Sequence, residues 1–240
     1  MGCIKNLIFR MKKGFLCTPF VVIAEEVLVP FITMSSTSVL ANWSPQTIIN
    51  TGTTLDWTVS GGVTIAKTTI NYPTFNFSGN SGIANILVEN VEGLTRLGCY
   101  QNSLTTLDVS KSTALEYLYI PLNFLTTLDL GINTVLATLS CYENSLTVLD
   151  ISANTALTLL RCYNNTISVL DVSANTALTE LACFGNNQAP SVTDQIFIDL
   201  DTNAQINGLL QIRNNRTSAS DTARANLITK GWSIYDTYTT

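Results

Sequence analysis

A phrase of 21 residues recurs along the middle of the chain without insertion or deletion. Four full rows begin at Leu94, Leu115, Leu136 and Leu157, and a partial fifth row begins at Leu178. Row three reads LATLSCYENSLTVLDISANTA, and its leucines, cysteine, asparagines and aspartate recur in most other rows. A constant period of this length indicates a solenoid, in which each row forms one coil that stacks on the next.

Each row divides into two half-phrases, L-x-x-L-x-C-x-x-N and L-T-x-L-D-V-S-x-N. The apolar residues in each half alternate, which predicts a short strand with one face inward, and each asparagine predicts a turn. We therefore expect two short strands per coil and parallel sheets that rise by about 4.8 Å at each step. The column of Cys99, Cys141, Cys162 and Cys183, with Ile120 in row two, is expected to pack in the core because free cysteine behaves as a small hydrophobe.

Both half-phrases match the motif L-x-x-L-x-L-x-x-N, so the chain resembles the leucine-rich repeat family. The phrase LxCYxNxLTxLDVSxNTAL is similar to the short-repeat variant found in secreted and surface proteins of Bacteroidetes-type bacteria and their phages. The resemblance covers residues 94–187. It implies a binding or adhesion module and no catalytic residue.

The two ends of a solenoid expose apolar surface that other segments must cover. Residues 42–93 alternate between apolar and polar and are interrupted by glycines, which predicts an N-terminal β cap of roughly three to five strands. Residues 188–240 predict a C-terminal α/β cap. The expected fold is therefore mainly β: a leucine-rich repeat solenoid of four to five coils with parallel strands, between a β cap and an α/β cap.

Within the C-terminal cap, Val192, Ile196 and Leu200 have helical spacing, and Thr193 is a candidate N-cap. The alternation around Ile198 also permits a strand there. Further on, GLLQIRNN predicts a strand and an asparagine turn, SASDTARANLITKG predicts a second helix, and a final strand is expected directly after it.

Residues 1–41 are apolar and unlike the rest of the chain, and three interpretations stay open. They form a cleaved targeting segment, an anchoring segment that docks on a membrane or a particle, or an over-long gene start with Met34 as the true beginning. No stretch reaches the roughly 18 uninterrupted apolar residues of a membrane span.

The composition of the chain argues against several classes of function. Charged residues make up 12% of the chain, the net charge is −5, and lysine and arginine are scattered, which argues against nucleic-acid binding. The chain has no histidine, so the usual general base and the commonest metal ligand are missing. We expect no enzymatic activity, no cofactor and no metal.

One polar column leaves a second interpretation open. It consists of Asp108, Asp129, Asp150 and Asp171, with serine or glycine two residues later. Such aspartates commonly accept a hydrogen bond from the backbone of their own turn, as in an Asx turn. The alternative is a row of Ca²⁺ ligands.

Aromatic residues form the most informative outward column: Tyr100, Pro121, Tyr142, Tyr163 and Phe184. An exposed aromatic stripe binds sugar rings or apolar protein surfaces, although stacked aromatics also stabilise a sheet by cross-strand contact. Neighbouring columns broaden the stripe. The candidate ligand-binding residues are Tyr100, Tyr117, Tyr119, Tyr142, Arg161, Tyr163 and Phe184.

The sequence therefore favours a non-catalytic recognition or adhesion module that binds a protein or a glycan and is displayed outside the cell, on a bacterial surface. The alternative is a structural protein of a phage virion, a capsid decoration or fibre component docked through its N-terminal segment. The sequence does not specify an oligomeric state.

Overall fold

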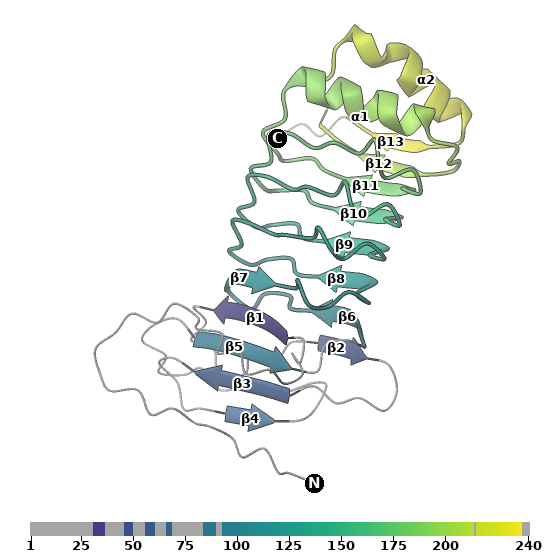
Figure 1. The fold of residues 1–240 in the computed structure, drawn as a ribbon. Coiled ribbons are helices and arrows are strands. Elements are labelled where there is room, and N and C mark those ends of the chain that lie inside the picture. Colours follow the sequence, from purple (N-terminus) through teal and green to yellow (C-terminus); the bar gives the residue numbers. More distant parts are fainter. Residues whose placement is uncertain are drawn as a thin grey trace.

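The computed structural model describes residues 93–213 and 215–236 and, upstream of them, the backbone of five strands. These strands are β1 (Phe31–Ser36), β2 (Gln46–Ile49), β3 (Asp56–Ser60), β4 (Ala66–Thr68) and β5 (Ala84–Glu89). The repeats stack into a column, with the N-terminal strands at one end and two helices at the other (Figure 1).

The first half-phrase of each row forms a short strand of one continuous parallel sheet. The strands from the five rows are β6 (Leu94–Gly98), β8 (Tyr117–Tyr119), β9 (Thr138–Ser140), β10 (Leu159–Arg161) and β11 (Glu180–Ala182). Two strands after the repeats, β12 (Leu209–Gln211) and β13 (Ser233–Tyr235), extend the same parallel sheet. Leu97 pairs with Leu118, Leu118 with Leu139 and Leu139 with Leu160, so the register steps by one repeat. The predicted coils and their parallel stacking are confirmed.

The second half-phrase does not form the parallel sheet that its alternation predicted. Only the first coil has a strand there, β7 (Leu104–Asp108), and it pairs antiparallel with β1. In the next three coils this half is made of turns and irregular backbone, with neighbouring coils joined by bonds such as that from the Ser145 amide to the Leu125 carbonyl, at 2.9 Å. The prediction of two strands per coil is therefore wrong for these coils. Their second halves are joined by isolated backbone bonds, whereas β7 has β1 as a pairing partner.

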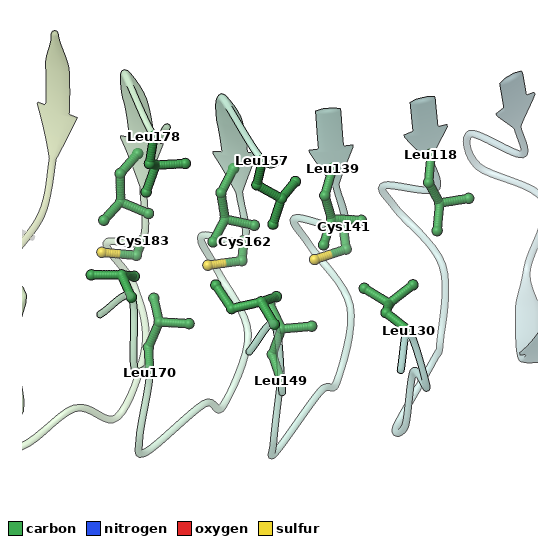
Figure 2. Packing of buried hydrophobic residues seen from close by; sticks show 14 of the residues in the cluster. Leu118, Leu130, Leu139, Cys141, Leu149, Leu157, Cys162, Leu170, Leu178 and Cys183 are labelled. Carbon is green, nitrogen blue, oxygen red and sulfur yellow. The ribbon is translucent and has the colours of Figure 1, made fainter. Parts of the chain in front are cut away.

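The interior is built from the predicted apolar columns. Leucines from both halves of each coil meet between the two sides, and the cysteine side chains lie among them in one row (Figure 2). Cys99, Cys141, Cys162 and Cys183 are fully buried and carry free thiols. Burial raises the pKa of Cys162 to about 12, so the thiol stays protonated at neutral pH. The cysteine column is packing, as predicted.

Asparagine side chains hold the turn at the end of each strand. The Oδ1 atom of Asn123 accepts the amides of Asn102 and Leu104, both at 3.0 Å, and its Nδ2 donates to the carbonyls of Cys99 at 2.7 Å and Ile120 at 3.0 Å. One side chain thus joins two coils and satisfies groups that the bend would otherwise leave unpaired. The predicted structural role of this asparagine column is confirmed.

The residue before each of these asparagines has left-handed backbone. Leu122, Glu143 and Asn164 all have φ of 52°, a conformation that costs an L-residue about 1–2 kcal/mol. Gly185 occupies the same position in the fifth coil with φ of 66°, and a Cβ there would lie 2.1 Å from Oδ1 of Asn164. The turn is strained, and the asparagine bonds offset the strain.

At the N-terminal end, the five-stranded sheet has the order β4-β3-β5-β1-β7. β2 pairs with β6 and continues the parallel sheet by one antiparallel strand. β1 lies between β5 and β7 in this sheet, although its residues fall inside the expected segment 1–41. Residues 1–30 lie outside the described part of the chain, and the boundaries 42–93, 94–187 and 188–240 remain predictions.

At the C-terminal end, α1 (Pro190–Thr202) confirms the predicted helix. The predicted N-cap is wrong: Ala189 caps the helix, and Thr193 lies inside it, where its hydroxyl donates to Asn215 Oδ1 at 2.6 Å. Pro190 explains the earlier start, since proline is well suited to the first helical position. A 3₁₀ turn, η1 (Ser218–Ser220), leads into α2 (Asp221–Thr229).

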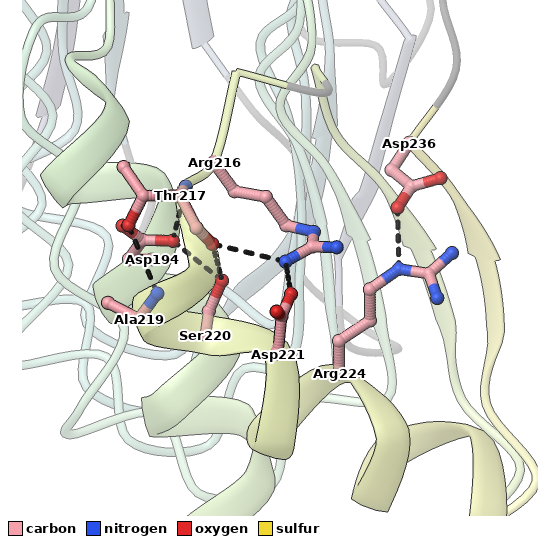
Figure 3. A network of polar contacts seen from close by, with 8 residues as sticks. All are labelled: Asp194, Arg216, Thr217, Ala219, Ser220, Asp221, Arg224 and Asp236. Carbon is pink, nitrogen blue, oxygen red and sulfur yellow. Dashed lines mark hydrogen bonds and ion pairs between the residues drawn. The ribbon is translucent and has the colours of Figure 1, made fainter.

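Polar contacts tie the two helices together (Figure 3). Asp194 of α1 accepts the Thr217 amide at 2.9 Å and the Ser220 hydroxyl at 2.6 Å, while Arg224 of α2 pairs with Asp236 at 2.7 Å. The Asp194 contacts join α1 to the segment that leads into α2, and the Arg224–Asp236 pair joins α2 to the residue after β13. Within the described residues, no helix is both long and apolar enough to span a membrane.

Candidate functional site: an aromatic ladder

Five aromatic rings, one from each coil, touch in succession along the outside of the sheet. We call them the aromatic ladder: Tyr100, Tyr119, Tyr142, Tyr163 and Phe184. Tyr142 stacks on Tyr163 with ring centroids 4.4 Å apart, and Tyr163 stacks on Phe184 at 4.6 Å, with planes 8° apart in both pairs. The parallel register of the coils produces this stacking, because it sets equivalent side chains one strand spacing apart.

In the second coil, the ladder uses a residue that the predicted aromatic column does not contain. Pro121 stands in the aromatic column there, but it is buried. Tyr119, from the neighbouring outward column, fills the gap: its ring lies 6.2 Å from Tyr100 and 6.4 Å from Tyr142. The hydroxyls of Tyr119 and Tyr142 are hydrogen-bonded at 3.0 Å.

The rings differ in exposure. Tyr100 and Tyr119 are 47% and 41% exposed, whereas Tyr142, Tyr163 and Phe184 are half-buried. Both faces of the Tyr163 ring are covered by its stacking neighbours, so solvent reaches mainly its edge and its hydroxyl. The ladder therefore presents ring edges and hydroxyl groups from Tyr142 onward and freer ring surface at Tyr100 and Tyr119.

Two phenols of the ladder, Tyr119 and Tyr163, have raised pKa values. The hydrogen bond to Tyr142, together with some burial, raises the pKa of Tyr119 to about 12. Burial raises the pKa of Tyr163 above its ordinary value. Both phenols thus keep their protons and can donate a hydrogen bond to a partner.

The other two candidate residues lie beside the ladder, each held by a neighbour. Tyr117 lies under the Arg96 guanidinium, whose central carbon is 3.7 Å from the ring centroid. Arg161 is paired with Glu180 at 2.6 Å. Sequence reasoning did not select Arg96 or Glu180, although Arg96 precedes Tyr117 by one repeat and pairs with it in the sheet.

The aspartate column makes Asx turns on the other side of the coil. Asp108, Asp129, Asp150 and Asp171 each accept the backbone amide two residues later, at 2.8–3.0 Å. The Ser152 hydroxyl adds a bond of 2.7 Å to Asp150. These bonds confirm the turn interpretation. No cluster of three or more histidine, cysteine, aspartate or glutamate residues able to hold a metal ion is found in the described part of the chain.

The sequence matches no protein-family model. No curated protein matches it either. Among solved structures, the protein is similar to one described as the functional domain of InlJ from Listeria monocytogenes, which includes a cysteine ladder. The match has a TM-score of 0.50 and 35% sequence identity, and it covers 59% of this chain and 31% of that chain.

The matched part is thus about a third of the neighbour's length, and the cysteine column of this chain corresponds to the feature named in its description. Together with the seven parallel strands, this similarity bears out the expected architecture. The chain has a mainly β, leucine-rich-repeat solenoid fold with few helices.

Proposed function

We propose that this protein is a non-catalytic recognition module that binds another protein through the aromatic ladder. The observation that carries the proposal is the unbroken succession of five rings, which extends over about 20 Å at strand spacing. Tyrosine and phenylalanine are enriched in protein interfaces, where they supply large contact areas at low entropic cost. The rigid solenoid fixes the rings in advance, so little order has to be gained on binding.

The stacking favours a protein over a glycan as the ligand. A sugar ring is held by lying flat on a free aromatic face. The faces between Tyr142, Tyr163 and Phe184 are closed, because the rings lie 4.4 and 4.6 Å apart. Ring edges and hydroxyls, in contrast, suit an irregular protein surface of mixed polarity.

We also propose that the module works outside the cell, on the surface of a Bacteroidetes-type bacterium. The low fraction of charged residues and the short-repeat phrase support this assignment. Mass spectrometry of the natural protein tests it, since loss of an N-terminal segment supports export. An intact N-terminus would instead support the virion role, with that segment docked on a particle.

The binding test compares the full-length chain with a Tyr142→Ala/Tyr163→Ala variant. Ligands are bacterial cells, proteins extracted from their surface, and surface polysaccharides. We expect binding to a surface protein to weaken by about 30-fold or more, which corresponds to ~2 kcal/mol from a hot-spot cluster. Circular dichroism checks that the variant remains folded.

The matched control is Thr127→Ala/Val148→Ala, which changes two exposed residues of adjacent coils in the other half-phrase. It should bind as the wild type does. Equal binding by the ladder variant would refute the site, and binding of both forms to a polysaccharide alone would replace the protein ligand with a glycan.

A further inference from the structure

A second site lies between the fourth coil and the C-terminal helix. An open pocket of about 330 Å³ separates the second half-phrase of that coil from α1. The coil contributes Val169, Asp171 and Ser173, and the helix contributes Val192, Gln195 and Asp199. This is the size of a small ligand site, and it combines apolar walls with two carboxylates.

Asp199 is the unusual member of the pocket. Its side chain belongs to a residue that is only 7% exposed, and its Oδ1 atom accepts a bond from Gln195 Nε2 at 2.7 Å. Its Oδ2 atom is buried with no hydrogen-bond partner. A buried carboxylate oxygen without a partner is costly, because it has lost its hydration without gaining a donor.

The surroundings add to this cost. Asp171 lines the same pocket, its own Oδ1 atom committed to the Ser173 amide at 2.9 Å. Burial and the charge of Asp171 raise the pKa of Asp199. None of the described residues that line the pocket is basic, so no positive charge there compensates the two carboxylates.

The fold holds this arrangement in place. The contacts of Asp194 with Thr217 and Ser220 attach α1 to the segment that leads into α2 (Figure 3). Ile196 of α1 and Leu170 of the coil lie in the same buried core, so helix and coil are packed together before any ligand arrives. Pre-formed sites of this kind bind at a lower entropic cost.

We propose that this pocket binds the guanidinium or ammonium end of an arginine or lysine side chain from a partner protein. The carboxylates of Asp171 and Asp199 receive the cation, and Val169 and Val192 contact its apolar stem. Arginine fits best, because its planar group donates several hydrogen bonds at once. Ca²⁺ is disfavoured, since it requires six to eight oxygen ligands and has no use for apolar walls.

The site lies in the half of the coil without strands and does not depend on the aromatic ladder. One partner protein can bind at both the pocket and the ladder, and either proposal can be refuted while the other stands. The test therefore uses a small probe with the full-length protein: N-acetyl-arginine amide, titrated by calorimetry or by NMR. Its matched control is N-acetyl-citrulline amide, which has the same shape and no charge.

We expect the arginine probe to bind, the citrulline probe not to bind, and Asp199→Asn to weaken the arginine probe by about tenfold or more. Asp150→Asn is the control variant, because Asp150 makes the equivalent turn one coil earlier and does not line this pocket. Val169→Arg, at a site 62% exposed, should abolish probe binding by placing a cation of the chain itself in the pocket.

Folding separates a binding role from a structural one. Because Asp199 lacks a partner for one oxygen, Asp199→Asn should leave the thermal midpoint of the free protein unchanged or higher. A lower midpoint would assign Asp199 to the scaffold and overturn the proposal, as would equal binding of the citrulline probe. Binding of Ca²⁺ in place of the arginine probe would make this a metal site and would also overturn the proposal.

Discussion

The two halves of each coil start from nearly the same pattern and fold differently. Both place leucines three residues apart and end at an asparagine. The first half pairs with its neighbours as a strand, whereas the second half, from the second coil on, forms turns. The halves differ at the residue directly after the second leucine, which varies in the first half and in the second half is an aspartate that captures a backbone amide. Apolar alternation therefore predicts which side chains are buried, but it does not predict whether a strand forms. The aspartate turn alone does not decide this either, because Asp108 makes the same turn at the end of β7, which forms a strand paired with β1.

The asparagine columns on the strand side and the turn side of the coil also differ, in the hydrogen bonds that their side chains make. Asn165, on the strand side, accepts the Leu146 amide at 3.0 Å and donates to the carbonyl of Cys162 at 3.1 Å. Asn154, on the turn side, donates to the carbonyls of Leu130 and Asn133, while its Oδ1 atom is buried without a partner. Those two carbonyls also accept backbone amides at 3.0 Å, so they remain paired without Asn154.

The largest expected effect comes from removing these asparagines one at a time. Asn165→Ala should lower the free energy of unfolding by about 3 kcal/mol, because it leaves the buried Leu146 amide unpaired in a strained turn. Asn154→Ala should cost only about 1 kcal/mol, because it also removes an unpaired oxygen. Urea denaturation followed by circular dichroism measures both. Equal losses of unfolding free energy would show that the two asparagine columns stabilise the fold equally, which would contradict the proposed difference between the two sides.

A smaller effect is expected from ring contacts on the strand side. In a double-mutant cycle, Tyr142→Ala and Tyr163→Ala should show a coupling of about 1 kcal/mol, the usual range for stacked aromatic pairs. The same cycle on Thr127 and Val148, which are exposed on the turn side, should show a coupling near zero. A coupling near zero for the tyrosines would mean that the ladder contributes nothing to stability and that its stacking serves binding alone.

The smallest effect concerns the turn side at low pH. Hydrogen bonds from the Ser152 hydroxyl and amide lower the pKa of Asp150 below its ordinary value. A carboxyl with a lowered folded pKa stabilises the fold above the unfolded pKa of about 3.9, and this contribution is lost as the pH falls through the folded value. Ser152→Ala should raise the pKa of Asp150, as an NMR titration can measure, and should reduce stability slightly at neutral pH but not in acid.

The control for this titration is Ser145→Ala, which changes an exposed serine where the two halves of the same coil meet. It should leave the Asp150 titration unchanged. An unaltered pKa in Ser152→Ala would show that the backbone amide, which this substitution retains, accounts for the whole shift.

Much of the fold and part of the site can be predicted from the sequence alone. Contacts between coils join residues one repeat apart, so a constant period already places Leu139 on Leu118 and Tyr163 on Tyr142. The apolar columns, the asparagine turns and the aspartate turns could be predicted for this reason, because each depends on local chemistry repeated at a fixed spacing. Of the seven candidate residues, five are joined in the ladder.

The tertiary structure decided the rest, where unlike segments meet. The spacing alone could not show that Tyr119 would bridge the gap at the buried Pro121, since that depends on how side chains turn at the end of a strand. It also could not place Asp199 against Asp171, because helix α1 lies outside the repeat and its position is fixed by polar contacts with the C-terminal cap. Contacts between equivalent residues of the repeat can be predicted from the sequence, because they recur at a fixed spacing. Contacts between the repeat and a helix outside it depend on packing that no local pattern encodes.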